Sequence, residues 1–159
     1  MKAILVKEPG GTDKLNYGEI KKPTINENEI LVKVKAAGIN RADIMQRQGK
    51  YPPPKGASKI LGLEISGEVV ELGKNVSRWK TGDNIFGLIS GGGYAEYAKI
   101  HQDMAIEKYD KLSFEEAAAI PEVFLTAYQA LFWNSTVQED DYVLIHAGGS
   151  DYYCIKGEA

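Results

Sequence analysis

Short β-prone segments, separated by glycine and proline turns, constrain the fold of the first two thirds of this chain more than any other feature. Between residues 31 and 35 apolar and charged residues alternate, which is the pattern of a half-buried strand. Gly67, inside another such segment, indicates a bulge or a close backbone approach. Short strands at this spacing are typical of a barrel or a sandwich. The expected strands cover residues 2–7, 14–20, 30–37, 65–72, 84–89 and 94–98.

One short helix is expected within this strand-rich part, over residues 40–49. Asn40 is suited to cap it and Gly49 to end it. The run Tyr51-Pro52-Pro53-Pro54 then predicts an extended, rigid loop, because proline fixes φ and removes a backbone donor. The glycines at 91–93 predict a turn into a strand rather than a phosphate loop, because no helical pattern follows them.

The pattern changes near residue 112, which we therefore predict as a domain boundary. Ser113, followed by acidic residues, is typical of a capped helix start. The segments expected beyond the boundary are helices over 113–119 and 123–133, separated by Pro121, and a strand over 142–146.

Composition excludes several classes of function. A net charge of −3, with no run of Lys or Arg longer than two, argues against nucleic acid as a partner, since phosphate binding needs a basic face. No stretch approaches the roughly 20 apolar residues that span a bilayer, and no signal peptide is evident. The single cysteine, Cys154, rules out an internal disulfide and a multi-cysteine zinc site. We expect a cytoplasmic protein that binds neither nucleic acid nor membrane.

A set of separated motifs resembles the medium-chain dehydrogenase/reductase superfamily, in its zinc-free quinone oxidoreductase branch. Each piece alone is weak, but the ordered set, which extends over residues 1–150, is specific. The matching segments are Asn40-Arg41-Ala42-Asp43, residues 46–54, Leu61-Gly62-Leu63-Glu64, Ser66-Gly67, Gly82-Asp83, residues 93–97, residues 117–121 and Leu125-Thr126-Ala127.

This resemblance implies a mainly β fold, a GroES-like partly open barrel with flanking helices, followed by the first strand of a Rossmann α/β unit. The domains expected from it are a GroES-like catalytic domain over 1–112, linker helices and the first Rossmann strand over 113–150, and a divergent tail over 151–159. The implied activity is metal-free hydride transfer to a quinone. The implied cofactor is NADPH, with NADH as an alternative.

The resemblance also implies roles for individual residues. Tyr51 is the expected catalytic donor in the substrate pocket, the alternative being a tyrosine packed on its proline loop. Asn40 is expected beside the nicotinamide, a role that is compatible with helix capping. Met45 is expected to line the cofactor pocket, although core packing is an alternative. Thr126 is expected to face the nicotinamide carboxamide, unless its hydroxyl bonds back within its own helix. Asp43 matches the motif but fits a helix-dipole role better than a catalytic one.

The absence of a metal is also implied by the residues. Zinc-dependent relatives carry a cysteine at the position of Asn40 and a His-Glu pair at that of Leu63-Glu64. Zinc requires thiolate, imidazole or carboxylate ligands in a tetrahedral set. An amide and an aliphatic chain are poor ligands, and Glu64 alone cannot hold the ion, so no metal site is expected.

The cofactor motif at the end of the chain departs from the family pattern. By resemblance Gly148, Gly149 and Ser150 are cofactor-binding positions, where the pyrophosphate meets a helix N-terminus. Asp151 follows directly, and its carboxylate would repel that ligand. We therefore expect a truncated form that is inactive alone. A further hypothesis is that residues 151–155 supply a strand to the barrel.

Two alternatives to quinone reduction remain. One is a zinc-free enoyl or alkene reductase of the same superfamily. The other is a non-catalytic GroES-like domain that self-associates or binds a full-length partner. An uncovered sheet edge would drive such association, and we expect a homodimer or another homo-oligomer.

Overall fold

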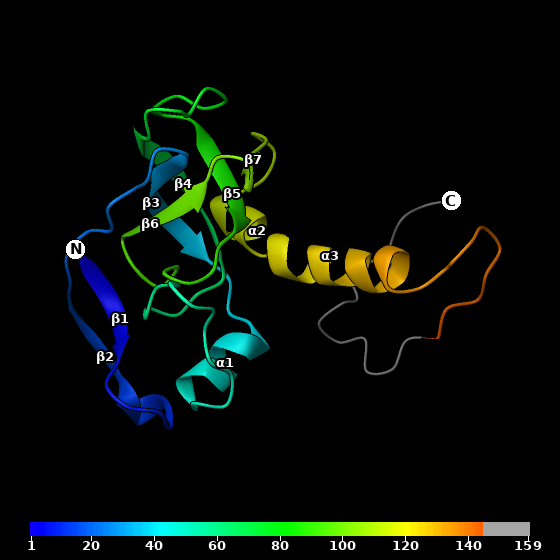
Figure 1. The fold of residues 1–159 in the computed structure, drawn as a ribbon, viewed down its shortest axis with the longest axis horizontal. Helices are drawn as coiled ribbons and strands as arrows, with labels where there is room; N and C mark the ends of the chain where they lie inside the picture. Colours follow the sequence, from blue (N-terminus) through cyan, green and yellow to red (C-terminus); the bar gives the residue numbers. More distant parts are fainter. Residues whose placement is uncertain (145–159) are drawn as a thin grey trace.

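A curled antiparallel sheet forms the centre of the molecule in the computed structural model, which describes residues 1–144 (Figure 1). The strand order is β6-β3-β4-β5-β7, and every neighbouring pair is antiparallel. The strands are β3 (Glu29–Ala37), β4 (Glu64–Leu72), β5 (Asn84–Leu88), β6 (Tyr97–His101) and β7 (Ala105–Glu107). The mainly β, GroES-like class expected from the sequence is confirmed.

β-Branched side chains on the inner face of this sheet build the core. Five of them are fully buried: Ile30, Val32, Ile65, Val69 and Ile85. The sheet curls where the β3–β4 register shifts, between Leu31 and Val32 and again between Val34 and Ala36, as bulges increase twist locally. Beside the second shift a Cβ on Gly67 would lie 2.3 Å from the Lys33 carbonyl oxygen. The bulge or close approach expected at Gly67 is therefore confirmed, since the structure shows both there.

A separate hairpin packs beside the sheet, and its contacts show that one strand begins later than expected. Its strands are β1 (Lys2–Val6) and β2 (Leu15–Glu19), joined through the short helix η1 (Thr12–Lys14). Ile4 N donates to Tyr94 O, and Glu96 N donates to Lys2 O. These bonds hold residues 94–96 against β1, so the strand predicted over 94–98 begins only at Tyr97 and runs to His101.

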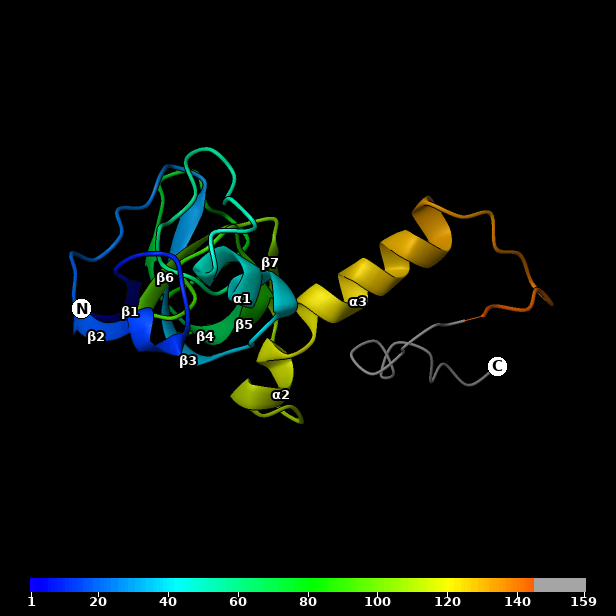
Figure 2. The same ribbon diagram turned by 90° about the horizontal axis from the view of Figure 1, so that it is seen from below.

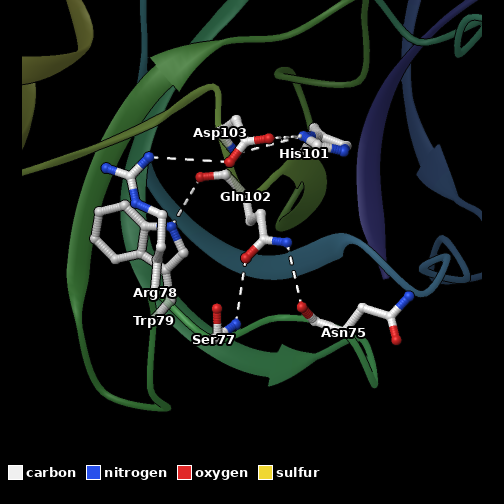
Figure 3. A network of polar contacts seen from close by, with 7 residues as sticks. All are labelled: Asn75, Ser77, Arg78, Trp79, His101, Gln102 and Asp103. Carbon is white, nitrogen blue, oxygen red and sulfur yellow. Dashed lines mark hydrogen bonds and ion pairs between the residues drawn. The ribbon is translucent and has the colours of Figure 1, made fainter.

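Gln102, just after β6, ties one end of the barrel together (Figure 3). Its carbonyl accepts from Trp79 Nε1 at 2.9 Å. Its side-chain amide accepts from Ser77 N at 3.2 Å and donates to Asn75 O at 3.3 Å. One residue thus fixes the turn that connects β4 to β5.

The helices lie outside the sheet, and their caps agree with the sequence. They are α1 (Arg41–Arg47), α2 (Phe114–Ala118) and α3 (Pro121–Tyr128), which continues as the π-helical turn η2 (Gln129–Trp133). Ser113 caps α2, accepting from Glu116 N at 3.1 Å, while the Glu116 carboxylate accepts from Ser113 N at 2.8 Å. Pro121 stands at the first turn of α3, where its missing N–H costs nothing.

The chain beyond α3 leaves the domain. In both views α3 projects away from the sheet, past α2 (Figures 1 and 2). Residues 142–144 do not form the strand expected over 142–146, and residues 145 and 146 lie outside the described part. A strand requires a hydrogen-bonded neighbour, and Tyr142 and Leu144 are exposed instead of paired.

Candidate functional site at the junction of α1, β4 and α3

The predicted site residues within the described part fall on three segments: α1 with its N-cap, the proline loop after α1, and α3. Asn40 is the N-cap residue of α1, and Met45 lies in the same helix. Tyr51 follows α1 on the proline loop, with 48% of its surface exposed. Thr126 is an exposed residue of α3. The cofactor positions Gly148, Gly149 and Ser150, and the strand hypothesis for residues 151–155, lie outside the described residues.

Asp43 is buried and joins three separate segments. Only 2% of its surface is exposed. Its Oδ2 accepts from the Asn40 backbone N at 2.9 Å and from the Tyr94 hydroxyl at 2.8 Å. Its Oδ1 accepts from Gly62 N at 3.1 Å. Asp43 therefore does more than complement the dipole of α1: it fixes the start of the helix to the loops on either side of it.

Glu64 is a second buried carboxylate, also 2% exposed, at the first residue of β4. Its Oε1 accepts from Asn40 Nδ2 at 2.8 Å, and its Oε2 accepts from Glu122 N at 2.9 Å. The side chain crosses directly over Gly38, where a Cβ would lie 1.9 Å from Glu64 Oε1. Glycine at 38 is therefore what lets the carboxylate reach both partners.

Burial and the two carboxylates together raise the pKa values of two neighbouring side chains, Tyr94 and Glu122. Burial raises the pKa of Tyr94 far above its usual range, and the hydrogen bond to Asp43 and the charges of Asp43 and Glu64 raise it further. Burial also raises the pKa of the Glu122 carboxyl, with additional repulsion from Glu64 and Asp43. Tyr94 accordingly remains a hydrogen-bond donor at neutral pH.

The network brings some of the predicted residues together and leaves others apart. Asn40 is connected through Glu64 to the first turn of α3, and Thr126 lies one turn further along that helix. Among the described residues no hydrogen bond of a Met45 or Tyr51 side chain joins this network. The nearby Gln46 Nε2 is a buried donor without a hydrogen-bond partner.

The hydrogen bonds that tie Tyr94, Glu64 and Glu122 N into this network were not predicted from the sequence. Glu64 offered a signal, because it is a charged residue beside the apolar run Leu61-Gly62-Leu63 and ahead of Ile65. A charge in such surroundings is rare unless it is paired. Tyr94 and Glu122 offered none, since their partners are distant in sequence.

Neither a metal cluster nor a membrane helix is present in the described part of the chain. Over residues 1–144 no three His, Cys, Asp or Glu side chains are grouped so as to hold a metal ion. Within the same residues no helix is long and apolar enough to cross a membrane.

Known proteins resemble the chain over nearly all of its length. The mouse synaptic vesicle membrane protein VAT-1 homolog-like is 34% identical over 149 residues, which are 94% of this chain and 36% of the relative. The quinone oxidoreductase from Coxiella burnetii has a TM-score of 0.88 and 37% identity, with 98% of this chain and 52% of that chain covered. The Escherichia coli quinone oxidoreductase complexed with NADPH has a TM-score of 0.78 and 34% identity, with 89% and 43% covered.

The chain thus spans about half, or less, of the length of these relatives. The domain family described as "Alcohol dehydrogenase GroES-like domain" matches residues 26–110, which contain β3 to β7, α1 and both buried carboxylates. The chain therefore belongs to the alcohol dehydrogenase GroES-like family of the medium-chain dehydrogenase/reductase superfamily, which includes the quinone oxidoreductases.

Proposed function

We propose that residues 1–144 form the substrate-facing and nicotinamide-facing wall of an NADPH-dependent quinone oxidoreductase, with NADH as the alternative cofactor. One observation carries the proposal: Glu64 joins Asn40 to the helix that bears Thr126, two residues expected at the nicotinamide from separate segments. The NADPH complex of the related Escherichia coli enzyme supports the choice of cofactor.

The polar groups of this wall suit a nicotinamide and a quinone. The Asn40 amide and the Thr126 hydroxyl are matched to a carboxamide, which both donates and accepts hydrogen bonds. Met45 would pack against the cofactor. The bound cofactor supplies a hydride, and the quinone gains that hydride and a proton to become a hydroquinone. Tyr51, exposed and without a hydrogen-bond partner among the described residues, would donate to the quinone oxygen on which charge develops.

We propose that this chemistry is metal-free. Asn40 and Leu63 stand where zinc-dependent relatives have ligands, and neither an amide nor an aliphatic side chain suits zinc. Both oxygens of Glu64 are already engaged by N–H donors. A quinone is electrophilic without a Lewis acid, so hydride from the reduced nicotinamide, together with hydrogen-bond donors for the developing oxyanion, would reduce it without a metal.

The wider assignments are also proposals. We infer a GroES-like catalytic domain over 1–112, linker helices and the segment that would supply the first Rossmann strand over 113–150, and a divergent tail over 151–159. We further infer a cytoplasmic protein that forms a homodimer or another homo-oligomer. Within the described residues β6 and β7 each have one unpaired edge, which supports self-association. Sedimentation should show a mass above that of one chain, and a monomer at all concentrations would contradict the assembly.

The activity is tested by titrating NADPH and NADH against the purified 159-residue polypeptide and assaying small quinones beside enals. We expect weak NADPH binding and no turnover by this polypeptide alone, because Asp151 sets a carboxylate at the expected pyrophosphate position. Rapid quinone turnover would contradict the inactive assignment. Reduction of enals but not quinones would favour an alkene reductase, and no binding of either cofactor would favour a non-catalytic domain.

A further inference from the structure

The buried carboxylate of Glu64 requires an explanation beyond packing. Removing a carboxylate from water is costly unless its oxygens receive hydrogen bonds. Each Glu64 oxygen receives one, and the two donors come from different elements: Asn40 Nδ2 before α1 and Glu122 N at the start of α3. The residue thus connects two parts of the proposed nicotinamide-facing wall.

The first of these bonds fixes the sense of the Asn40 amide. An ionised carboxylate only accepts hydrogen bonds, whereas an amide has a donor end and an acceptor end. Asn40 can therefore face Glu64 only with its nitrogen, at 2.8 Å. Its oxygen is turned away from the carboxylate, and the amide cannot rotate by half a turn without placing oxygen against oxygen.

The second bond fixes the start of α3. The first N–H groups of a helix have no partner within it, and a negative charge there is favourable. Pro121 has no N–H, so Glu122 N is an early donor of α3, and Glu64 Oε2 accepts from it at 2.9 Å. Thr126 lies four residues further on, on the same side of the helix. The position of the helix start therefore decides where the Thr126 hydroxyl lies.

We infer that Glu64 is a positioning residue, which holds the Asn40 amide in one orientation and sets the position of α3, and with it Thr126, relative to Asn40. The inference rests on the proposed function where it concerns the cofactor. Its structural part, the coupling of Asn40 and α3 through one side chain, holds with or without a ligand.

The test compares Glu64→Gln with the unaltered 159-residue chain in ¹⁵N NMR spectra without cofactor. This variant keeps the size of the side chain over Gly38, but its amide has only one acceptor end for two donors. We expect the Asn40 side-chain NH₂ resonances to move and the Glu122 amide to exchange about tenfold faster, since hydrogen bonds to charged groups are among the stronger ones. Glu71→Gln, on an exposed residue of the same strand, is the matched control and should change neither signal. Unmoved Asn40 resonances, or an unchanged Glu122 exchange rate, would overturn the inference.

A reciprocal exchange provides the second readout. Asn40→Asp alone sets a new carboxylate against that of Glu64, so the melting temperature should fall, and more at pH 8 than at pH 5. Adding Glu64→Gln restores one donor facing one acceptor, so the double variant should recover most of the loss. Additive losses would count against the pairing.

NADPH titration separates this inference from the proposed function. We expect Glu64→Gln to weaken NADPH binding about tenfold, as loss of a charge-assisted contact would, while Glu71→Gln leaves it unchanged. If the unaltered chain binds no NADPH, the proposed function fails for this polypeptide, and the NMR comparison alone decides the role of Glu64.

Discussion

At the scale of single residues, two buried carboxylates organise the site. Asp43 and Glu64 are each 2% exposed, and together they accept five hydrogen bonds from donors on α1, α3 and two loops. Removing one partner of such a buried hydrogen bond lowers the free energy of unfolding, because the remaining polar group stays buried without a partner. Substitutions here should therefore affect stability more than their small size suggests.

Tyr94→Phe should destabilise the fold by about 1–2 kcal/mol, since it removes the hydroxyl that donates to Asp43 while leaving the ring in place. Urea denaturation measures the change. Tyr17→Phe is the matched control, because Tyr17 is an exposed tyrosine on β2 and its hydroxyl has no hydrogen bond in the described residues. Equal effects of the two substitutions would show that the Tyr94–Asp43 bond contributes nothing.

Glu122 gives the stability a pH dependence with a definite sign. Its pKa is raised in the folded state by burial and by the charges of Glu64 and Asp43. The folded protein therefore binds the proton of the Glu122 carboxyl more tightly than the unfolded chain does. The stability that this proton contributes is lost as the pH rises above the ordinary carboxyl pKa of 4.5. Glu122→Gln should therefore raise the melting temperature above that of the unaltered chain, and this gain should be larger at pH 8 than at pH 4. Glu115→Gln, on an exposed residue of α2, should show no such trend; a gain for Glu122→Gln that is independent of pH would refute the assignment.

At the scale of elements, caps and turns were predictable because their causes are local. Asn40 before α1 and Ser113 before α2 were evident from residue type and spacing. At Gly67 the residue type alone indicated a close approach, while its partner, the Lys33 carbonyl, lies far away in the sequence. The start of β6 was not, because it depends on bonds from residues 94–96 to β1, which is distant in sequence. The strand expected over 142–146 required a neighbour that residues 1–144 do not supply.

The cap of α2 provides a test at this scale. Ser113→Ala removes the hydroxyl that accepts from Glu116 N and should cost about 1 kcal/mol of unfolding free energy at pH 7. Hydrogen bonds from the Ser113 backbone and side chain also lower the pKa of Glu116. The part of the stability that comes from the ionised Glu116 carboxylate should therefore fade as the pH drops through the acid range. Ser77→Ala, at an exposed serine bonded only through its backbone N, is the control and should be neutral. A loss no larger than that of Ser77→Ala would contradict the capping role.

At the scale of the whole molecule, the sequence predicted the fold class and the family but not the network at the centre of the site. Tyr51, Asn40, Met45 and Thr126 came from a resemblance, and the structure adds the physical connection between Asn40 and α3. That connection joins segments far apart in the chain, so no local pattern could reveal it. Tyr51 remains a prediction, since its side chain is 48% exposed and has no hydrogen bond among the described residues.

NMR mapping with reduced nicotinamide mononucleotide on the 159-residue chain shows whether the wall that carries Asn40, Tyr51 and Thr126 faces the nicotinamide. This ligand carries the nicotinamide half of the cofactor without the pyrophosphate and adenosine that the remainder of the site would bind. We predict shifts centred on the Asn40 side chain, Tyr51 and Thr126, and none there with AMP. Shifts confined to the groove beside β6, around Tyr97 and His101, or equal shifts with AMP at Asn40 and Thr126, would contradict the account.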